Sequence, residues 1–218
     1  MTDTTLVIAN KNYSSWSLRA WLFLRHTGIR FHEVRIGLGE PTTRERIARY
    51  SPSGRVPVLV EGALTVWDSL AICEYANEAH AGGSGWPADR AARAEARAVS
   101  AEMHSGFPGL RSELPMNIRA RRRVTPSAAA QADIARVLGM WEHCRVRHAA
   151  EGPWLFGRFS IADAMYAPVV TRFLTYDVAL DADCSAYCRT IMSMPAMQEW
   201  MAAAKEEPED IEELEMEF

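Results

Sequence analysis

The fold of this chain is decided by residues 53–69, which read Ser-Gly-Arg-Val-Pro-Val-Leu-Val-Glu-Gly-Ala-Leu-Thr-Val-Trp-Asp-Ser. This pattern predicts a loop, two short strands and the start of a helix. Pro57 opens an apolar run, and because proline lacks the N–H that a central strand needs, it belongs at a strand start or edge. The backbone of Val56 therefore keeps free groups, with which an extended peptide-like ligand can pair as an added strand.

The second half of this segment leads directly into a helix. Glu61-Gly62 is typical of a two-residue hairpin turn, and residues 64–67 form the return strand. Asp68 and Ser69 are good capping residues for a helix over residues 70–78. Unpaired N–H groups and the helix dipole make such a helix start attractive to a carboxylate.

A free backbone edge followed by a helix start resembles the glutathione site of the glutathione transferase family. In that family, the residue before a cis-proline pairs with the cysteinyl part of glutathione, and an acidic-Ser pair at the next helix holds the γ-glutamyl end. The resemblance implies these roles for Val56, Pro57, Asp68 and Ser69, with a cis bond before Pro57. Arg55 is a candidate for the glycyl carboxylate because its fork geometry suits a carboxylate; the alternative is a solvated loop charge.

The flanking segments predict a thioredoxin-like domain over residues 1–80. Its other elements are short and periodic: a strand at 5–9, a helix ending at 27–28, a strand at 31–38 and a short helix up to residue 50. Thr42 and Glu45 have the spacing of a capping box for that short helix. The resulting order βαβαββα is that of a thioredoxin-like fold.

The second half of the chain predicts an all-α domain. Residues 81–87 are glycine-rich and read as a linker, and residues 88–205 show no strand pattern that competes with helix. We expect Pro108 to kink a helix rather than end it, and Thr125-Pro126 to start the next one. Ser160-Ile-Ala-Asp163 is a second capping box and is similar to the folding box of the same family. The predicted fold class is a thioredoxin-like α/β domain followed by an all-α domain.

Composition excludes several classes of protein. With 218 residues and 48% hydrophobic residues, the chain can bury a proper core. It has neither an apolar run near the ~20 residues of a membrane span nor a signal-peptide pattern, so we expect a soluble, cytoplasmic protein. The four cysteines lack metal-type spacing and are expected to be buried thiols, with no metal site.

Charge is unevenly distributed along the chain, whose formal net charge is −4. Residues 206–218 carry eight acidic side chains, and we interpret them as a solvated acidic tail. Arginines cluster at residues 119–123 without interleaved aromatic residues, which favours an exposed turn over a nucleic-acid site.

The loop before the first helix supplies the candidate thiolate donors. A transferase must keep the sulfur of glutathione as a thiolate, because the thiolate is the nucleophile. The resemblance implies a bacterial-type protein with a serine-type active site, whose Ser-x-x-Ser/Cys-x-Arg motif fits Ser14, Ser17 and Arg19. Ser14 is favoured, Ser15 is second because a one-residue shift of the helix start exchanges them, and Tyr13 is third. The alternative for each is an ordinary helix cap.

The electrophile pocket is expected between the domains, against the first helix of the second one. Its candidate lining residues are Met103, His104, Phe107, Arg111, Met116 and Asn117. Methionine and phenylalanine at this spacing also fit a core, and His104 also fits a helix surface. The loop at residues 10–19 has no cysteine, which disfavours thiol–disulfide exchange.

The sequence therefore predicts a glutathione S-transferase that conjugates glutathione to a small hydrophobic electrophile, as in detoxification. The resemblance also implies a homodimer. One alternative is a glutathione-transferase-like binding or regulatory protein without catalysis. The other is a glutathione-dependent isomerase, because Ser14-Ser15 resembles the zeta class, which includes maleylacetoacetate isomerases. Trp16 stands where that class has a cysteine.

Overall fold

The N-terminal part of the chain forms a four-stranded mixed sheet with the order β2-β1-β3-β4. The structure is a computed structural model, and it describes residues 4–211. The central strand β1 (Thr4–Ile8) is parallel to β2 (His32–Arg35) and antiparallel to β3 (Val58–Glu61). The edge strand β4 (Leu64–Trp67) is antiparallel to β3. In this register Val7 lies opposite both Val34 and Val58.

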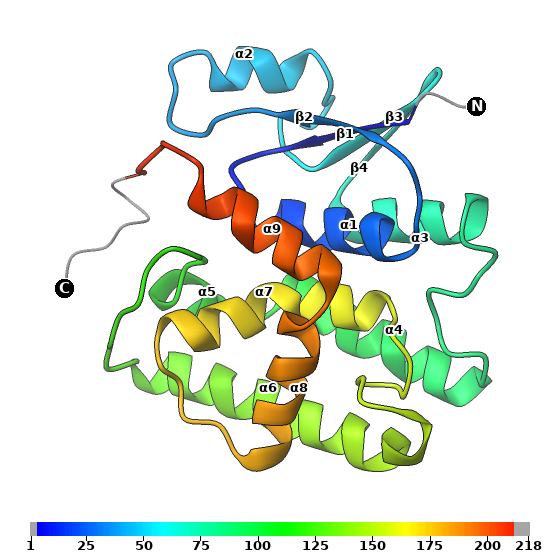
Figure 1. The fold of residues 1–218 in the computed structure, drawn as a ribbon, viewed down its shortest axis with the longest axis vertical. Helices are drawn as coiled ribbons and strands as arrows, with labels where there is room; N and C mark the ends of the chain where they lie inside the picture. Colours follow the sequence, from blue (N-terminus) through cyan, green and yellow to red (C-terminus); the bar gives the residue numbers. More distant parts are fainter. Residues whose placement is uncertain (1–3, 212–218) are drawn as a thin grey trace.

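The sheet separates two hydrophobic layers. Val7 packs in a small cluster with Ile36, Ile47 and Val58, on the side covered by α2 (Thr43–Ala48). Alternate residues of β1 face the opposite side, where they join the main core with α1 (Ser15–His26) and α3 (Ser69–Ala79). Figure 1 shows α2 on the outer side of the sheet and α1 and α3 on the inner side. This arrangement confirms the predicted thioredoxin-like fold.

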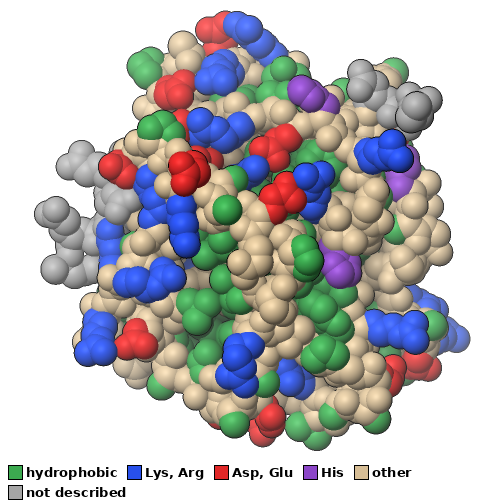
Figure 2. Space-filling view, viewed as in Figure 1, with side chains coloured by type: hydrophobic (Ala, Val, Ile, Leu, Met, Phe, Trp, Pro, Cys, Tyr) green, Lys and Arg blue, Asp and Glu red, His purple; other side chains and the backbone are tan. Residues whose placement is uncertain are grey.

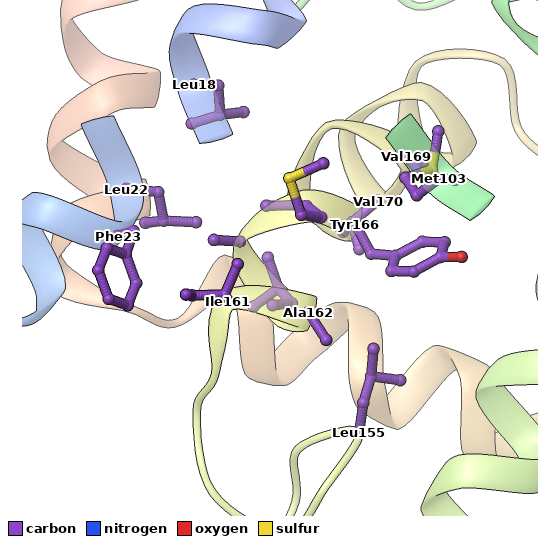
Figure 3. Close-up of a cluster of buried hydrophobic side chains, with 14 of the residues drawn as sticks. Leu18, Leu22, Phe23, Met103, Leu155, Ile161, Ala162, Tyr166, Val169 and Val170 are labelled. Carbon is purple, nitrogen blue, oxygen red and sulfur yellow. The ribbon is translucent and has the colours of Figure 1, made fainter. Parts of the chain in front are cut away.

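The remainder of the described chain is mostly helical. Its helices are α4 (Arg90–Ser105), α5 (Pro108–Glu113), α6 (Ala128–His148), the 3-10 turn η1 (Ala149–Glu151), α7 (Ile161–Thr175), α8 (Ala182–Met192) and α9 (Pro195–Lys205). In Figure 1, α4 to α8 lie beneath α1 and α3, while α9 lies beside α1, where Trp200 contacts Trp21. Helix α7 is buried along nearly its whole length. Figure 3 shows side chains of α1, such as Leu22 and Phe23, near Ile161 and Ala162 of α7. The two halves of the molecule thus share one continuous core.

Two predicted helix boundaries in the helical part are wrong. Helix α4 ends at Ser105 instead of continuing through a kink at Pro108, which begins α5. Phe107 has φ 61° and ψ 50°, and this left-handed conformation cannot continue a right-handed helix. Helix α6 begins after Ser127, whose hydroxyl accepts a hydrogen bond from the N–H of Ala130, and not at Thr125-Pro126.

Other local predictions can be checked in the same way. The hairpin turn is Gly62-Ala63, one residue later than expected, because Glu61 pairs with Leu64. The predicted capping box of Thr42 and Glu45 is wrong, because the Thr42 side chain forms no cap hydrogen bond within the described chain. The capping box of Ser160 and Asp163 is confirmed.

The C-terminal segment, residues 206–211, packs against the N-terminal part of the chain, so the interpretation of this part as a solvated tail is wrong. The Glu207 carboxylate is buried and accepts hydrogen bonds from the N–H groups of Lys11 (2.7 Å) and Asn12 (3.0 Å). Arg35 pairs with Glu209 at 2.8 Å. The rest of the predicted acidic tail, residues 212–218, lies outside the described residues.

Basic and acidic side chains are interspersed over the upper part of the face in Figure 2, where Figure 1 places α2 and the sheet. Within residues 4–211, no helix is both long enough and apolar enough to cross a membrane.

Candidate functional site

A cavity of about 470 Å³ opens between the sheet region and the helical region. The hairpin, the start of α3, the first turn of α1 and the end of α4 contribute its walls. The lining residues are Trp16, Ser53, Arg55, Val56, Pro57, Trp67, Asp68, Ser69 and His104. The five binding residues predicted within the segment 55–69 therefore all line one cavity; they are Arg55, Val56, Pro57, Asp68 and Ser69.

The first wall is the backbone of Val56 and Pro57. The peptide bond between them is cis, and β3 begins directly after it at Val58. The N–H and C=O groups of Val56 make no hydrogen bond to any residue in the described range. The free backbone edge at Val56, predicted from the position of Pro57, is therefore available to a ligand.

The second wall is the start of α3. Asp68 caps this helix as predicted, because its Oδ1 accepts hydrogen bonds from the N–H groups of Leu70 (2.9 Å) and Ala71 (3.3 Å). Its backbone has φ 77°, a conformation that non-glycine residues rarely adopt and that recurs at functional sites. The Ser69 hydroxyl is buried and has no hydrogen-bond partner among the described residues. A buried hydroxyl at a helix start is suited to an anionic ligand.

The third wall joins the two regions through His104 of α4. Its Nε2 lies 3.1 Å from Oδ2 of Asp68. Its ring also meets the ring of Trp16 edge to face, with a centroid distance of 5.1 Å. Asp68 and Trp16 thus position His104. Among the residues predicted for the electrophile pocket, only His104 lines this cavity.

The two candidate serines make different hydrogen bonds. Ser14 caps α1: its hydroxyl accepts from the N–H of Ser17 (3.3 Å) and donates to the hydroxyl of Ser17 (2.7 Å). The hydroxyl of Ser15 accepts from Nη2 of Arg172 at 3.3 Å. Both side chains are buried near the cavity wall formed by Trp16, and neither contributes to its lining.

The third candidate donor, Tyr13, faces the C-terminal segment. Its hydroxyl accepts hydrogen bonds from the Arg119 side chain (3.0 Å) and from the N–H of Ile211 (3.2 Å). Asn117, predicted as a pocket residue, accepts a hydrogen bond from the Asn12 side chain at 3.0 Å and is buried. Both residues hold the loop before α1 and lie away from the cavity lining.

The other predicted pocket residues lie in the interior. Met103, Phe107 and Met116 belong to the main hydrophobic core. Arg111 is half-buried, and its side chain donates to the backbone C=O groups of Gly106, Met103 and His104. Its guanidinium lies 4.9 Å from the centroid of the Trp16 ring, which lines the cavity, while Arg111 itself does not.

Sequence reasoning did not identify Ser53, Trp67 and Trp16 as lining residues. Ser53 and Trp67 lie within the segment that decided the fold, so their proximity to Val56 was a usable signal. Trp16 was considered only as the residue that stands where the zeta class has a cysteine. A tryptophan in the first turn of a helix, next to candidate catalytic serines, was the available indication of a pocket wall.

A thioredoxin-like sheet followed by a helical region, with a cavity at a cis-proline and a helix start, defines the class of two-part proteins built from a thioredoxin-like domain and an all-helical domain. The sequence agrees with this assignment. It matches the model of the glutathione S-transferase N-terminal domain over residues 13–79 and that of the C-terminal domain over residues 91–203. The chain therefore belongs to the glutathione S-transferase family.

Solved structures share the fold over almost the whole chain. A glutathione transferase homolog from Burkholderia GL BGR1, with bound glutathione, is 23% identical with a TM-score of 0.72, and the match covers 95% of this chain and 100% of that one. The tau class glutathione S-transferase MiGSTU from mango, Mangifera indica, is 20% identical with a TM-score of 0.69, covering 93% and 96%.

Curated relatives match only in part. A dichloromethane dehalogenase from Methylorubrum extorquens is 36% identical over 66 residues, 29% of this chain and 23% of the relative. A probable maleylacetoacetate isomerase from Caenorhabditis elegans is 32% identical over 96 residues, 44% of each chain. The match thus spans less than half the length of either relative.

Proposed function

We propose that this protein is a glutathione transferase with a serine-type active site of the bacterial type. The thiolate of bound glutathione attacks an electrophilic carbon of a small hydrophobic substrate, either adding to it or displacing a leaving group. The observation that carries the proposal is that Val56, whose backbone groups are free, and Ser69, whose hydroxyl has no partner among the described residues, line one cavity. Together they match a short peptide with a terminal carboxylate.

Five of the lining residues have a role in this proposal. The backbone of Val56 pairs with the cysteinyl part of glutathione, and the cis-proline shapes that edge. Ser69 and the start of α3 hold the γ-glutamyl carboxylate, while Asp68 holds the γ-glutamyl ammonium group. Arg55 receives the glycyl carboxylate.

The thiolate is stabilised at the start of α1. A free thiol has a pKa of ~8.5, and a helix N-terminus with a hydrogen-bond donor lowers it. Motif spacing favours Ser14 as the donor. Hydrogen bonding favours Ser15, because its oxygen accepts from the positively charged Arg172 and its own proton is uncommitted, whereas the proton of Ser14 is given to Ser17.

We further propose that residues 1–80 form the glutathione domain, residues 81–87 the linker and residues 88–205 the domain that supplies the electrophile pocket. The position of the cavity between the sheet and α4 supports this division. By analogy with its family, we propose that the protein acts as a homodimer in the cytoplasm.

The direct test is a pH titration of glutathione mixed with the protein, followed by thiolate absorbance. We expect the bound thiol to titrate at least one pH unit below free glutathione, which corresponds to about 1.4 kcal/mol of thiolate stabilisation. Free glutathione at the same concentration is the control. Binding without a lowered pKa contradicts catalysis and favours a binding or regulatory protein. Absence of binding contradicts the proposal altogether.

A glutathione-dependent isomerase is the second candidate, favoured by the local similarity to the probable maleylacetoacetate isomerase. Isomerisation regenerates glutathione, because the thiolate adds to a carbon and then leaves it. Conjugation consumes one glutathione per product. Measurement of free thiol during turnover therefore distinguishes the two.

A further inference from the structure

Three arginine side chains lie close enough to act on one another electrostatically and have no acidic ion-pair partner among the described residues. They are Arg19 of α1, Arg111 of α5 and Arg172 of α7. Arg19 is 0% exposed and Arg172 is 4% exposed. None of the three forms an ion pair with a residue in the described part of the chain. A buried charge without a counter-charge is strongly destabilising unless something compensates it.

The hydrogen bonds of these arginines leave several N–H groups unused. Arg19 donates through Nε to the C=O of Met165 (3.1 Å), and Arg172 donates through Nη2 to Ser15. Nη1 and Nη2 of Arg19, and Nε and Nη1 of Arg172, are buried and have no partner among the described residues. Nearly all buried polar groups are satisfied in folded proteins, so these four nitrogen atoms call for an explanation.

The three charges act on one another. Burial, and then the neighbouring Arg111 and Arg172, lower the pKa of Arg19. Burial and Arg111 lower the pKa of Arg172 to about 9, so it remains protonated at neutral pH. Asp68 acts on Arg19 electrostatically, but its carboxylate is already engaged by the start of α3 and by His104.

Arg111 connects this cluster to the cavity. Trp16 lines the cavity, and the guanidinium groups of Arg19 and Arg111 lie 4.4 Å and 4.9 Å from the centroid of its ring. Arg111 is half-buried and uses Nε and Nη2 on backbone C=O groups, which leaves Nη1 uncommitted within the described chain. Arg111 does not line the cavity itself, but it lies against Trp16 and donates to the C=O of His104, which both do. As the half-exposed member of the three, it is the arginine closest to a ligand bound beside these two residues.

We infer that the electrophilic co-substrate carries a carboxylate, which binds beside Trp16 with Arg111 as its direct partner and with Arg19 and Arg172 as the positive charge behind it. This inference rests on the proposed function and specifies its substrate class: an apolar electrophile with one anionic group. Guanidinium groups bind carboxylates through charge-assisted hydrogen bonds, and a dry site strengthens them. The carboxylate also supplies a counter-charge that no described residue gives the cluster through an ion pair.

The test compares 4-chloro-3-nitrobenzoate with its neutral methyl ester. In both, the glutathione thiolate forms a C–S bond at the ring carbon, the C–Cl bond breaks, and chloride leaves with the bonding electrons. Each kcat/KM is divided by the rate constant of the uncatalysed reaction, because the two rings differ in reactivity. For the wild type we expect the acid to be preferred at least tenfold, mainly through KM. Equal normalised values overturn the inference.

Two substitutions test whether Arg111 is the arginine that binds the carboxylate. Arg111→Met should lower kcat/KM for the acid at least tenfold and that for the ester less than twofold. Arg136→Met, which removes an exposed arginine paired with Glu102, is the matched control and should change neither. An equal loss for both substrates in Arg111→Met overturns the role of Arg111. If that variant fails to fold, the wild-type preference for the acid still decides the inference.

A binding measurement separates this inference from the proposed function. Calorimetry with 3-nitrobenzoate, which cannot react with glutathione by this route, should show binding to the wild type that weakens at least tenfold in Arg111→Met. If glutathione does not bind and nitrobenzoate does, the transferase proposal fails and the anion site stands. If nitrobenzoate binds the wild type and Arg111→Met equally, the anion site fails.

Discussion

Nε2 of His104 lies 3.1 Å from Oδ2 of Asp68, so a residue near the end of α4 contacts the residue that caps α3. The other oxygen of Asp68 accepts the N–H groups of Leu70 and Ala71. One carboxylate therefore ties the helical region to the helix start at which we place the γ-glutamyl end of glutathione.

Asp68→Asn should weaken glutathione binding at least about tenfold, measured by calorimetry, because the charge opposite the ligand ammonium is lost. Asparagine also caps helices and tolerates positive φ, so the free energy of unfolding should change by less than about 1 kcal/mol. Asp89→Asn, at the similar cap of α4, is the matched control and should bind glutathione normally. Unchanged affinity in Asp68→Asn removes the proposed role.

Ser15→Ala should raise the pKa of the bound glutathione thiol, followed by thiolate absorbance, because the donor supported by Arg172 is removed. Ser14→Ala should instead cost about 1 kcal/mol of unfolding free energy through the lost cap of α1. If only Ser14→Ala raises the thiol pKa, the donor is the residue that motif spacing favours.

Glu207→Ala should lower the free energy of unfolding by about 1–3 kcal/mol in urea titrations, because it leaves the buried N–H groups of Lys11 and Asn12 without their acceptor. The neighbouring Glu206→Ala is the control: this side chain is exposed, so less than about 0.5 kcal/mol is expected. Equal effects of both substitutions argue against the packed C-terminal segment.

Titration of Asp163 should lower the free energy of unfolding as pH rises. Burial raises the pKa of this carboxyl group from 3.8 to about 6, against the opposing hydrogen bonds from Leu155, Ser160 and Tyr187. The folded state then holds more protons than the unfolded state between these values, so the free energy of unfolding falls by about 1.4 kcal/mol per pH unit and levels off above pH 6.

Comparison with Asp163→Asn isolates this effect, because all other carboxyl groups are present in both proteins. The difference in unfolding free energy, wild type minus variant, should fall by about 2 kcal/mol between pH 4.5 and 6.5 in urea titrations. A difference that is constant or that rises with pH contradicts the raised pKa.

All four cysteines should resist modification in the folded protein. Each is buried, as the sequence predicted, and burial raises the thiol pKa of Cys144, Cys184 and Cys188 to about 12 and that of Cys73 further still. A thiol-exchange reagent acts on the thiolate, so no rapid reaction is expected without denaturant and four equivalents are expected with it. Rapid reaction of any native thiol contradicts this burial.

The sequence was sufficient to predict those features that depend only on neighbouring residues. The proline at the strand start, the return strand and the cap at Asp68 lie in one short segment, and backbone hydrogen bonding between near neighbours fixes their conformation. The two helix boundaries that were predicted wrongly, at Pro108 and Thr125, are sites where several residues can supply the cap and tertiary packing selects one.

By itself, therefore, the sequence determined the order of strands and helices, the hairpin and the helix start that face the cavity. Only the tertiary structure decided that His104 reaches Asp68, that arginines from α1 and α5 lie over the ring of Trp16, and that Glu207 returns to Lys11. The reason is physical: periodicity and capping depend on residues a few positions apart, whereas these contacts join distant segments and exist only once the shared core has fixed the helices relative to the sheet.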